Sequence, residues 1–205
     1  MNINFPVKIR VVICVLLCAP VFWAVSQEES REEIRGEVIY AAGSGFELVR
    51  DGDTREYDLS AETVEGMDLF SGDYINTYGN TFLEIQTLPS QNLLKVSENT
   101  SFKVQELTEQ GGGSFELTYG RVRAKVEKMA GLEKFSIKGP SMVAGVRGTD
   151  FGYDIVYGGD EEKERTVALV YCFEGEVDVA TEEETETAEM VIGEDEMVSL
   201  VEKEE

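Results

Sequence analysis

The feature that most constrains the fold is a local pattern that recurs along the chain: a glycine, then a charged residue, then a short run typical of a strand. It occurs at Gly36-Glu37, Gly72-Asp73, Gly120-Arg121, Gly175-Glu176 and Gly193-Glu194. Glycine permits a tight reversal of the backbone, and the charged residue lies on the solvent face as the next strand begins. The pattern therefore predicts a chain that doubles back often through short strands of similar build.

Candidate strands follow one another from Glu37 to Val201, and no stretch keeps a helical period long enough for a helix. The turn at Arg50–Asp53 is predicted to close a hairpin, because Asp51-Gly52 supplies the left-handed dihedrals that such a turn needs. This spacing is typical of a sandwich, a jelly roll or an irregular solenoid. We predict one all-β domain over residues 36–201, after a polar linker at 27–35 and before an acidic tail at 202–205.

The first 26 residues have the composition of a secretory signal peptide. Lys8 and Arg10 precede an apolar run from Val11 to Val25, and no acidic residue occurs before Gln27. The apolar run is 15 residues long, whereas a spanning helix needs about 20. We therefore predict a signal peptide at residues 1–26 and an exported protein. An uncleaved signal anchor is the alternative, and only then would the protein be tied to a membrane.

The composition removes several classes of function. The 205 residues include no histidine, and 41 acidic residues against 18 basic ones give a formal charge of −23. Ser–His and Cys–His dyads and histidine-ligated metals are therefore excluded, and so acidic a surface repels nucleic acids. Acidic residues are too numerous for a catalytic pair to be singled out. We expect no enzyme, no cofactor and no metal site, and a buried, inert thiol at Cys172.

Charge is distributed unevenly along the chain. Residues 121–147 hold seven basic and two acidic residues, and residues 160–205 hold three basic and 18 acidic ones. One interpretation is internal pairing of the basic side chains with an outward acidic row at Glu174, Glu176 and Asp178. The other is a basic row that docks an acidic partner. That row would consist of Arg121, Arg123, Lys125, Lys134 and Lys138.

The segment Phe135–Asp154 resembles the signature of the FecR domain family: a strand, a proline turn, small apolar residues, then Val-Arg-Gly-Thr-x-Phe. The matching residues are Pro140, Gly145, Val146, Arg147, Gly148, Thr149 and Phe151. Further segments resemble other parts of the family pattern, at Met67–Thr77, Leu117–Ala124 and Val167–Val179. One departure is Gly139, where the family often has threonine.

The resemblance implies a bacterial cell-envelope domain of solenoid-like or jelly-roll-like all-β build. In its best-known members this domain is the periplasmic half of a transmembrane sigma-factor regulator. Because only the predicted signal precedes Gln27, we expect no cytoplasmic anti-sigma segment here. We therefore expect a non-catalytic interaction or signalling module of the periplasm that binds an envelope protein. A module that binds cell-wall glycan on the same fold is the alternative.

Most of the signature is predicted to be structural. Arg147 stands among apolar residues, so burial of its neighbours would require a partner for its guanidinium. The expected partners are Asp150, Asp154 or a set of carbonyl groups. The alternative is that Arg147 contacts a ligand.

Overall fold

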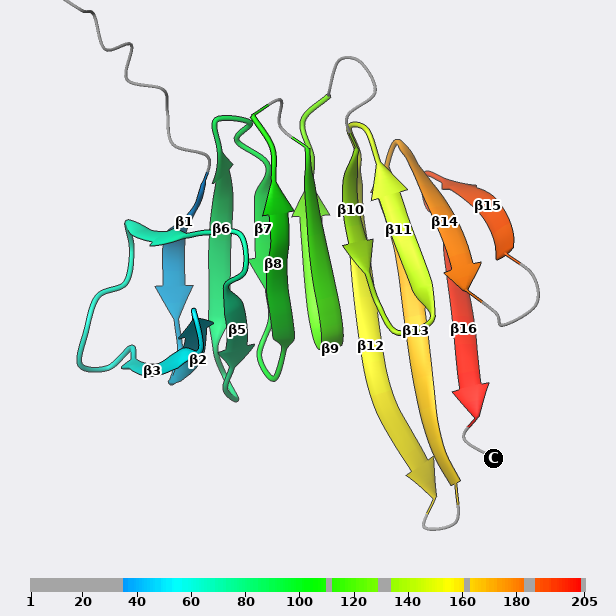
Figure 1. The fold of residues 1–205 in the computed structure, drawn as a ribbon. Helices are drawn as coiled ribbons and strands as arrows, with labels where there is room; N and C mark the ends of the chain where they lie inside the picture. Colours follow the sequence, from blue (N-terminus) through cyan, green and yellow to red (C-terminus); the bar gives the residue numbers. More distant parts are fainter. Residues whose placement is uncertain (1–34, 110–111, 129–133, 161–162, 183–186, 204–205) are drawn as a thin grey trace, which may run out of the picture. The chain divides into compact units, whose positions relative to one another are not determined.

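The computed structural model describes residues 35–109, 112–128, 134–160, 163–182 and 187–203. The regular elements in these ranges are strands, which confirms the all-β prediction (Figure 1). Within the same ranges, no helix has the length and hydropathy needed to cross a membrane. The predicted signal peptide, nearly all of the predicted linker and the last two residues of the tail lie outside the described residues.

The strands form two layers, both within the unit Glu32–Glu205. The first sheet has the order β4 (Met67–Leu69), β1 (Arg35–Ala42), β6 (Phe82–Leu88), β7 (Leu93–Val96), β9 (Gly113–Lys125), β12 (Asp150–Asp160), β13 (Lys163–Glu174), β16 (Met197–Lys203). The second sheet has the order β3 (Asp53–Asp58), β2 (Gly45–Arg50), β5 (Tyr74–Thr77), β8 (Ser101–Leu107), β9, β10 (Phe135–Lys138), β11 (Met142–Val146), β14 (Glu176–Glu182), β15 (Thr187–Gly193).

Strand β9 belongs to both sheets. Its first half pairs with β8 and, in parallel, with β10, and its second half pairs with β7 and β12. The change of sheet falls at Gly120, whose φ is 93°. A Cβ there would lie 2.5 Å from the Cα of Thr100. The predicted reversal at Gly120 is therefore wrong: the glycine bends one continuous strand from one layer into the other.

The core lies between the two layers. An aromatic series crosses it, with ring centroids 5.4 Å apart for Phe102 and Phe115, 4.8 Å for Phe115 and Phe135, and 6.4 Å for Phe135 and Phe151. The last step joins the second sheet to the first, because Phe135 lies on β10 and Phe151 on β12. Tyr153 also reaches across, since its hydroxyl donates to the carbonyl of Met142 at 2.8 Å.

Both sheets are open as far as the described strands go. The first ends at β4 and β16, and the second ends at β3 and β15. The chain advances through the sandwich from its blue end to its red end and passes between the layers as it goes (Figure 1). The predicted Asp51-Gly52 hairpin is confirmed: both residues have positive φ, and Arg50 pairs with Asp53.

Candidate functional site

The family-like signature forms the crossover from β11 in the second sheet to β12 in the first. Thr149, in the middle of this crossover, is buried. Its Oγ1 donates to the carbonyl of Glu176 at 2.7 Å, and its own carbonyl accepts from the N–H of Val126 at 2.9 Å. Thr149 thus ties the crossover both to the start of β14 and to the segment that follows β9.

Two glycines allow this crossover to pack closely against its neighbours. Gly148 has φ 131°, and a Cβ at that position would lie 2.8 Å from the Cα of Lys128. Gly175, at the turn from β13 to β14, has φ 92°, and its Cβ would lie 3.1 Å from the carbonyl oxygen of Gly148. Larger residues would force the loops apart, so the glycine of the signature has a steric reason.

The other apolar signature residues lie in the core. Val146 and Phe151 are 2% and 0% exposed, and Gly145 is buried in β11. Pro140 is exposed at the turn that joins β10 to β11. These positions agree with a structural role for most of the signature.

Arg147 does not make the contacts expected of a structural clamp. Its side chain is exposed. The two carboxylates expected as its partners bind other arginines: Arg123 Nε lies 2.8 Å from Asp150 Oδ1, and Arg121 Nε lies 2.7 Å from Asp154 Oδ2. The prediction that Arg147 clamps Asp150, Asp154 or a set of carbonyl groups is therefore wrong for the described residues. Its premise fails because the chain leaves the second sheet at Val146, so the residue after it is free to point outward.

Arg147 lies at the wall of a surface hollow of about 630 Å³. The hollow is lined by the signature crossover, by the β13–β14 turn and by the turn after β15. Its charged lining residues are Arg147, Glu176, Asp178 and Glu194. All four are exposed. A guanidinium among carboxylates presents donors and acceptors side by side, which suits a polar, protein-like surface better than an anion alone.

The predicted basic row is not one surface. Val122 and Ala124 are buried, so Arg121, Arg123 and Lys125 point outward from the first sheet. In β10, Phe135 and Ile137 are buried, so Lys134 and Lys138 point outward from the second sheet. Because the sheets pack face to face, the two groups lie on opposite sides of the sandwich. The five residues therefore do not form a single docking row. The prediction failed because alternation along a strand shows which side chains share a face, but not which sheet the strand joins.

The arginines on the first sheet are paired with carboxylates of β12. Arg123 donates to both carboxylate oxygens of Asp150 at 2.8 Å, and its Cζ lies 4.0 Å from the ring centroid of Phe173. Asp154 accepts from Arg121 at 2.7 Å and from the hydroxyl of Tyr171 at 2.5 Å. Burial, and then the hydrogen bond to Asp154, raise the pKa of Tyr171 above its ordinary value.

Internal pairing therefore describes the outer face of the first sheet, with partners other than the predicted acidic row. On the second sheet, Asp178 of that row lies near a predicted basic residue: its Oδ2 is 3.9 Å from the Nζ of Lys134. Both of these side chains are more than half exposed, and such pairs contribute little to stability.

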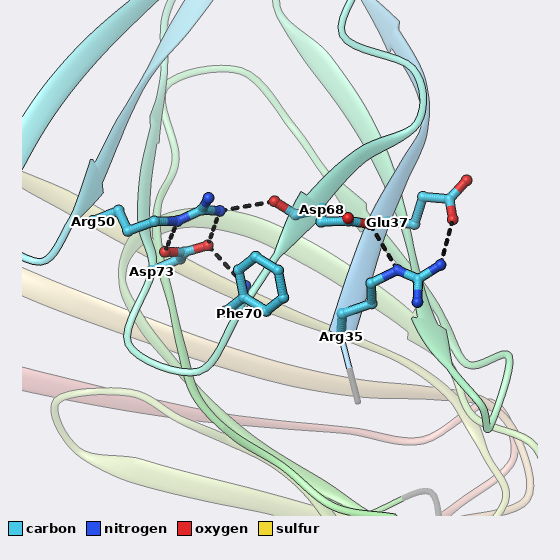
Figure 2. Close-up of polar contacts among 6 residues, drawn as sticks. All are labelled: Arg35, Glu37, Arg50, Asp68, Phe70 and Asp73. Carbon is cyan, nitrogen blue, oxygen red and sulfur yellow. Dashed lines mark hydrogen bonds and ion pairs between the residues drawn. The ribbon is translucent and has the colours of Figure 1, made fainter. Parts of the chain in front are cut away.

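The sequence did not reveal an ion pair between a buried carboxylate and a partly exposed arginine near the other end of the sandwich (Figure 2). The side chain of Asp73 is 2% exposed. Its carboxylate accepts from Arg50 Nε at 2.8 Å, from Arg50 Nη2 at 2.6 Å and from the N–H of Phe70 at 2.8 Å. Arg50 also donates to the carbonyl of Asp68 at 2.7 Å.

At Gly72-Asp73 the prediction that the charged residue lies on the solvent face is wrong, because Asp73 turns inward directly before β5. The partner could not be found from spacing, since Arg50 lies on β2 and Asp73 precedes β5. The Asp73 carboxylate accepts three hydrogen bonds, and these hold the β4–β5 loop to the second sheet.

Neither metal-ligand clusters nor accessible thiols mark a reactive centre in the described ranges. No group of three or more acidic or cysteine side chains there is placed to hold a metal ion. Cys172 is a buried free cysteine, as predicted. Burial raises the pKa of its thiol, which favours the unreactive protonated form.

Comparison with known proteins gives one family and one fold. A family model described as FecR protein matches residues 73–178, about half of the chain. Two crystal structures of a candidate anti-sigma factor from Parabacteroides distasonis ATCC 8503, at 1.65 and 2.50 Å resolution, share the fold with a TM-score of 0.50 and 17% identity. Each match covers 64% of this chain and 58% of the other. No curated protein sequence matches the chain.

Proposed function

This chain belongs to the FecR protein family, and from that membership we propose that it is an exported, non-catalytic interaction module that acts in signalling at the bacterial cell envelope. The family match and the shared fold support a signalling-related module. Export rests on the basic and apolar composition of residues 1–26.

The observation that carries the proposal is the contrast within the signature. The contacts of three signature residues, Gly148, Thr149 and Phe151, explain their structural roles. Arg147 has none: it is exposed and makes no hydrogen bond or ion pair to any described residue. A crossover tied down by Thr149, which presents a guanidinium with no partner among the described residues beside a hollow, is a preorganised contact for another protein, since little ordering of the loop remains to be done on binding.

Crosslinking in intact cells tests this function. A photoreactive residue placed near the hollow should capture an envelope protein, and Arg147→Ala should reduce the capture without lowering the melting temperature. Lys125→Ala is the matched control, because Lys125 is also exposed and its side chain makes no hydrogen bond or ion pair to a described residue. If Arg147→Ala lowered the melting temperature as well as the capture, a contact role for Arg147 would be contradicted.

The same preparation separates the glycan alternative. Purified cell wall should not sediment the protein at high salt if the module binds a protein partner. Cosedimentation that survives high salt would replace the proposed function by wall binding. Mass spectrometry of the protein from the envelope fraction should give Gln27 as the first residue, which tests export and cleavage together.

A further inference from the structure

The two ends of the sandwich differ in how their edge strands are protected. At one end, the edge strand of the second sheet, β3, reads Asp-Thr-Arg-Glu-Tyr-Asp, and the edge strand of the first sheet, β4, is only 3 residues long. Charge and shortness are the usual means by which sheet edges avoid pairing with another chain. At the other end β16 begins Met-Val-Ser-Leu-Val, without a charge in the segment Met197–Val201. The charges of this edge strand, coloured red in Figure 1, are at its end, Glu202 and Lys203, so Met197–Val201 lacks the protection that the first end has.

The backbone of β16 offers hydrogen-bonding groups on its open side. The N–H of Cys172 donates to the carbonyl of Glu196 at 3.0 Å, and the register continues without a shift from Tyr171↔Met197 onward. In an antiparallel ladder the bonded pairs alternate, so Val198 and Leu200 direct their backbone groups toward β13. The intervening residues Met197, Ser199 and Val201 direct theirs to the open side. Among the described strands, β16 pairs with β13 alone.

An apolar surface leads to this edge across the outer face of the first sheet. Val156, Val167 and Val201 lie opposite one another on β12, β13 and β16. Val156 and Val201 are each 49% exposed, and Met197 at the start of β16 is 66% exposed. A strand added to β16 would extend the valine row and would cover Met197, which gives it side-chain contacts besides the backbone bonds.

We propose that β16 accepts an extended segment of a partner protein by strand addition, and that this segment has an apolar centre flanked by lysine or arginine. The inference rests on the proposed interaction function and names the kind of partner. It concerns a surface distinct from the Arg147 hollow in its contacts, since no residue of β16 lines that hollow.

Charge decides between the candidate occupants of this edge. The turn that leads into β16 carries three exposed acidic residues, Glu194, Asp195 and Glu196. Residues 160–205 hold 18 acidic residues against three basic ones. A second copy of the chain would bring the same negative charge to the same edge, whereas a segment with basic flanks is attracted to it.

Hydrogen exchange on the full chain with synthetic peptides tests the proposal. One peptide has a Val-Thr-Val-Thr-Val centre with lysines at both ends, and its counterpart has glutamates at both ends. The lysine peptide should slow exchange at the amides of Met197, Ser199 and Val201, and the glutamate peptide should not. Ser199→Pro should weaken binding by about tenfold, because proline removes an outward N–H and leaves the ladder with β13 intact. Ser199→Thr, the matched control, should bind as the unmodified chain does.

Three outcomes would overturn the inference. The first is binding of the lysine peptide without protection of β16, or with equal protection of β3. The second is unchanged affinity in Ser199→Pro at an unchanged melting temperature. The third is a dimer that Ser199→Pro dissociates, which would assign the edge to a second copy. A photoreactive residue at the hollow that captures a partner whose binding Ser199→Pro leaves intact would leave the proposed function standing while this inference fails.

Discussion

Gly139 and Tyr153 show, at the scale of single residues, how a side chain on one sheet fixes the residue type on the other. A Cβ at Gly139 would lie 2.2 Å from the Tyr153 hydroxyl and 2.7 Å from its Cζ. Tyr153 is fully buried, so its ring cannot move aside cheaply. The family pattern often has threonine at this position. Glycine here is therefore explained by the tyrosine that faces it.

Gly139→Ala should lower the free energy of unfolding by roughly 1–3 kcal/mol through overpacking. Tyr153→Phe alone should cost about 1 kcal/mol, because it loses the hydrogen bond to Met142. The double variant should lose less unfolding free energy than the sum of the two single losses, since the phenylalanine lacks the hydroxyl that lies closest to the added Cβ. Urea unfolding of all four proteins measures this coupling. Strict additivity would show that the two residues do not contact each other in the folded state.

We expect the ionisation of Tyr171 to lower the stability of the protein at high pH. Its pKa is raised above the ordinary value of 10.0, first by burial and then by the hydrogen bond to Asp154. A raised pKa means that the folded state holds the proton more tightly, so the contribution is complete below about pH 10 and is lost as the pH rises further. Between about pH 9 and 11, Tyr171→Phe should therefore lose stability less steeply than the unmodified chain.

Chemical unfolding at each pH checks this slope, and Tyr40→Phe supplies the baseline for an exposed tyrosine. The ionisation of Tyr171 would play no part in alkaline unfolding if the slopes of the unmodified chain and Tyr171→Phe coincided.

At the scale of elements, β9 depends on its glycine. Gly120→Ala places a Cβ in the left-handed region and within 2.5 Å of the backbone of Thr100. We expect a loss of roughly 2–4 kcal/mol in unfolding free energy, from backbone strain and the clash together. Gly158→Ala on β12 is the matched control, because Gly158 has no positive φ and no atom within 4 Å of the added Cβ. Thermal unfolding compares the two, and equal melting temperatures would contradict a special role for Gly120.

Sequence reasoning reached the faces of these strands but not their partners. Alternation correctly placed Val122 and Ala124 inward and Arg121 and Arg123 outward. It could not show that β9 changes layers at Gly120, because a glycine between two alternating runs is compatible with a bend as well as with a reversal. Alternation does not predict strand β11 for a related reason: its small and apolar residues are buried nearly throughout.

At the candidate site, too, local features could be predicted from the sequence, whereas contacts between distant segments could not. The motif around Arg147 was found from the sequence. An internal partner for Arg147 was inferred from its apolar neighbours, but the chain leaves the second sheet at Val146. The Arg50–Asp73 clamp joins segments that only the assembled second sheet brings together. Contacts of this kind depend on topology, and a single sequence does not contain the strand order.

At the scale of the whole molecule, the net charge makes stability depend on salt. A formal charge of −23 opposes the compact state through self-repulsion. Raising NaCl from about 0.01 M to 0.15 M shortens the Debye length from about 30 Å to 8 Å, so the melting temperature should rise by a few degrees. Near the sequence isoelectric point of about 4.3 the same addition should change it little. Calorimetry at both pH values measures the difference, and a fall of the melting temperature with salt at neutral pH would show that ion pairs outweigh repulsion.

The shared strand gives the module a mechanical property. A displacement of β12 relative to β7 acts on the second half of β9, and the same unbroken backbone continues into the other layer beside β8 and β10. The two sheets are therefore connected covalently through one continuous strand, which bends at Gly120. A pull applied on one side of the sandwich can reach the other without either layer first coming apart.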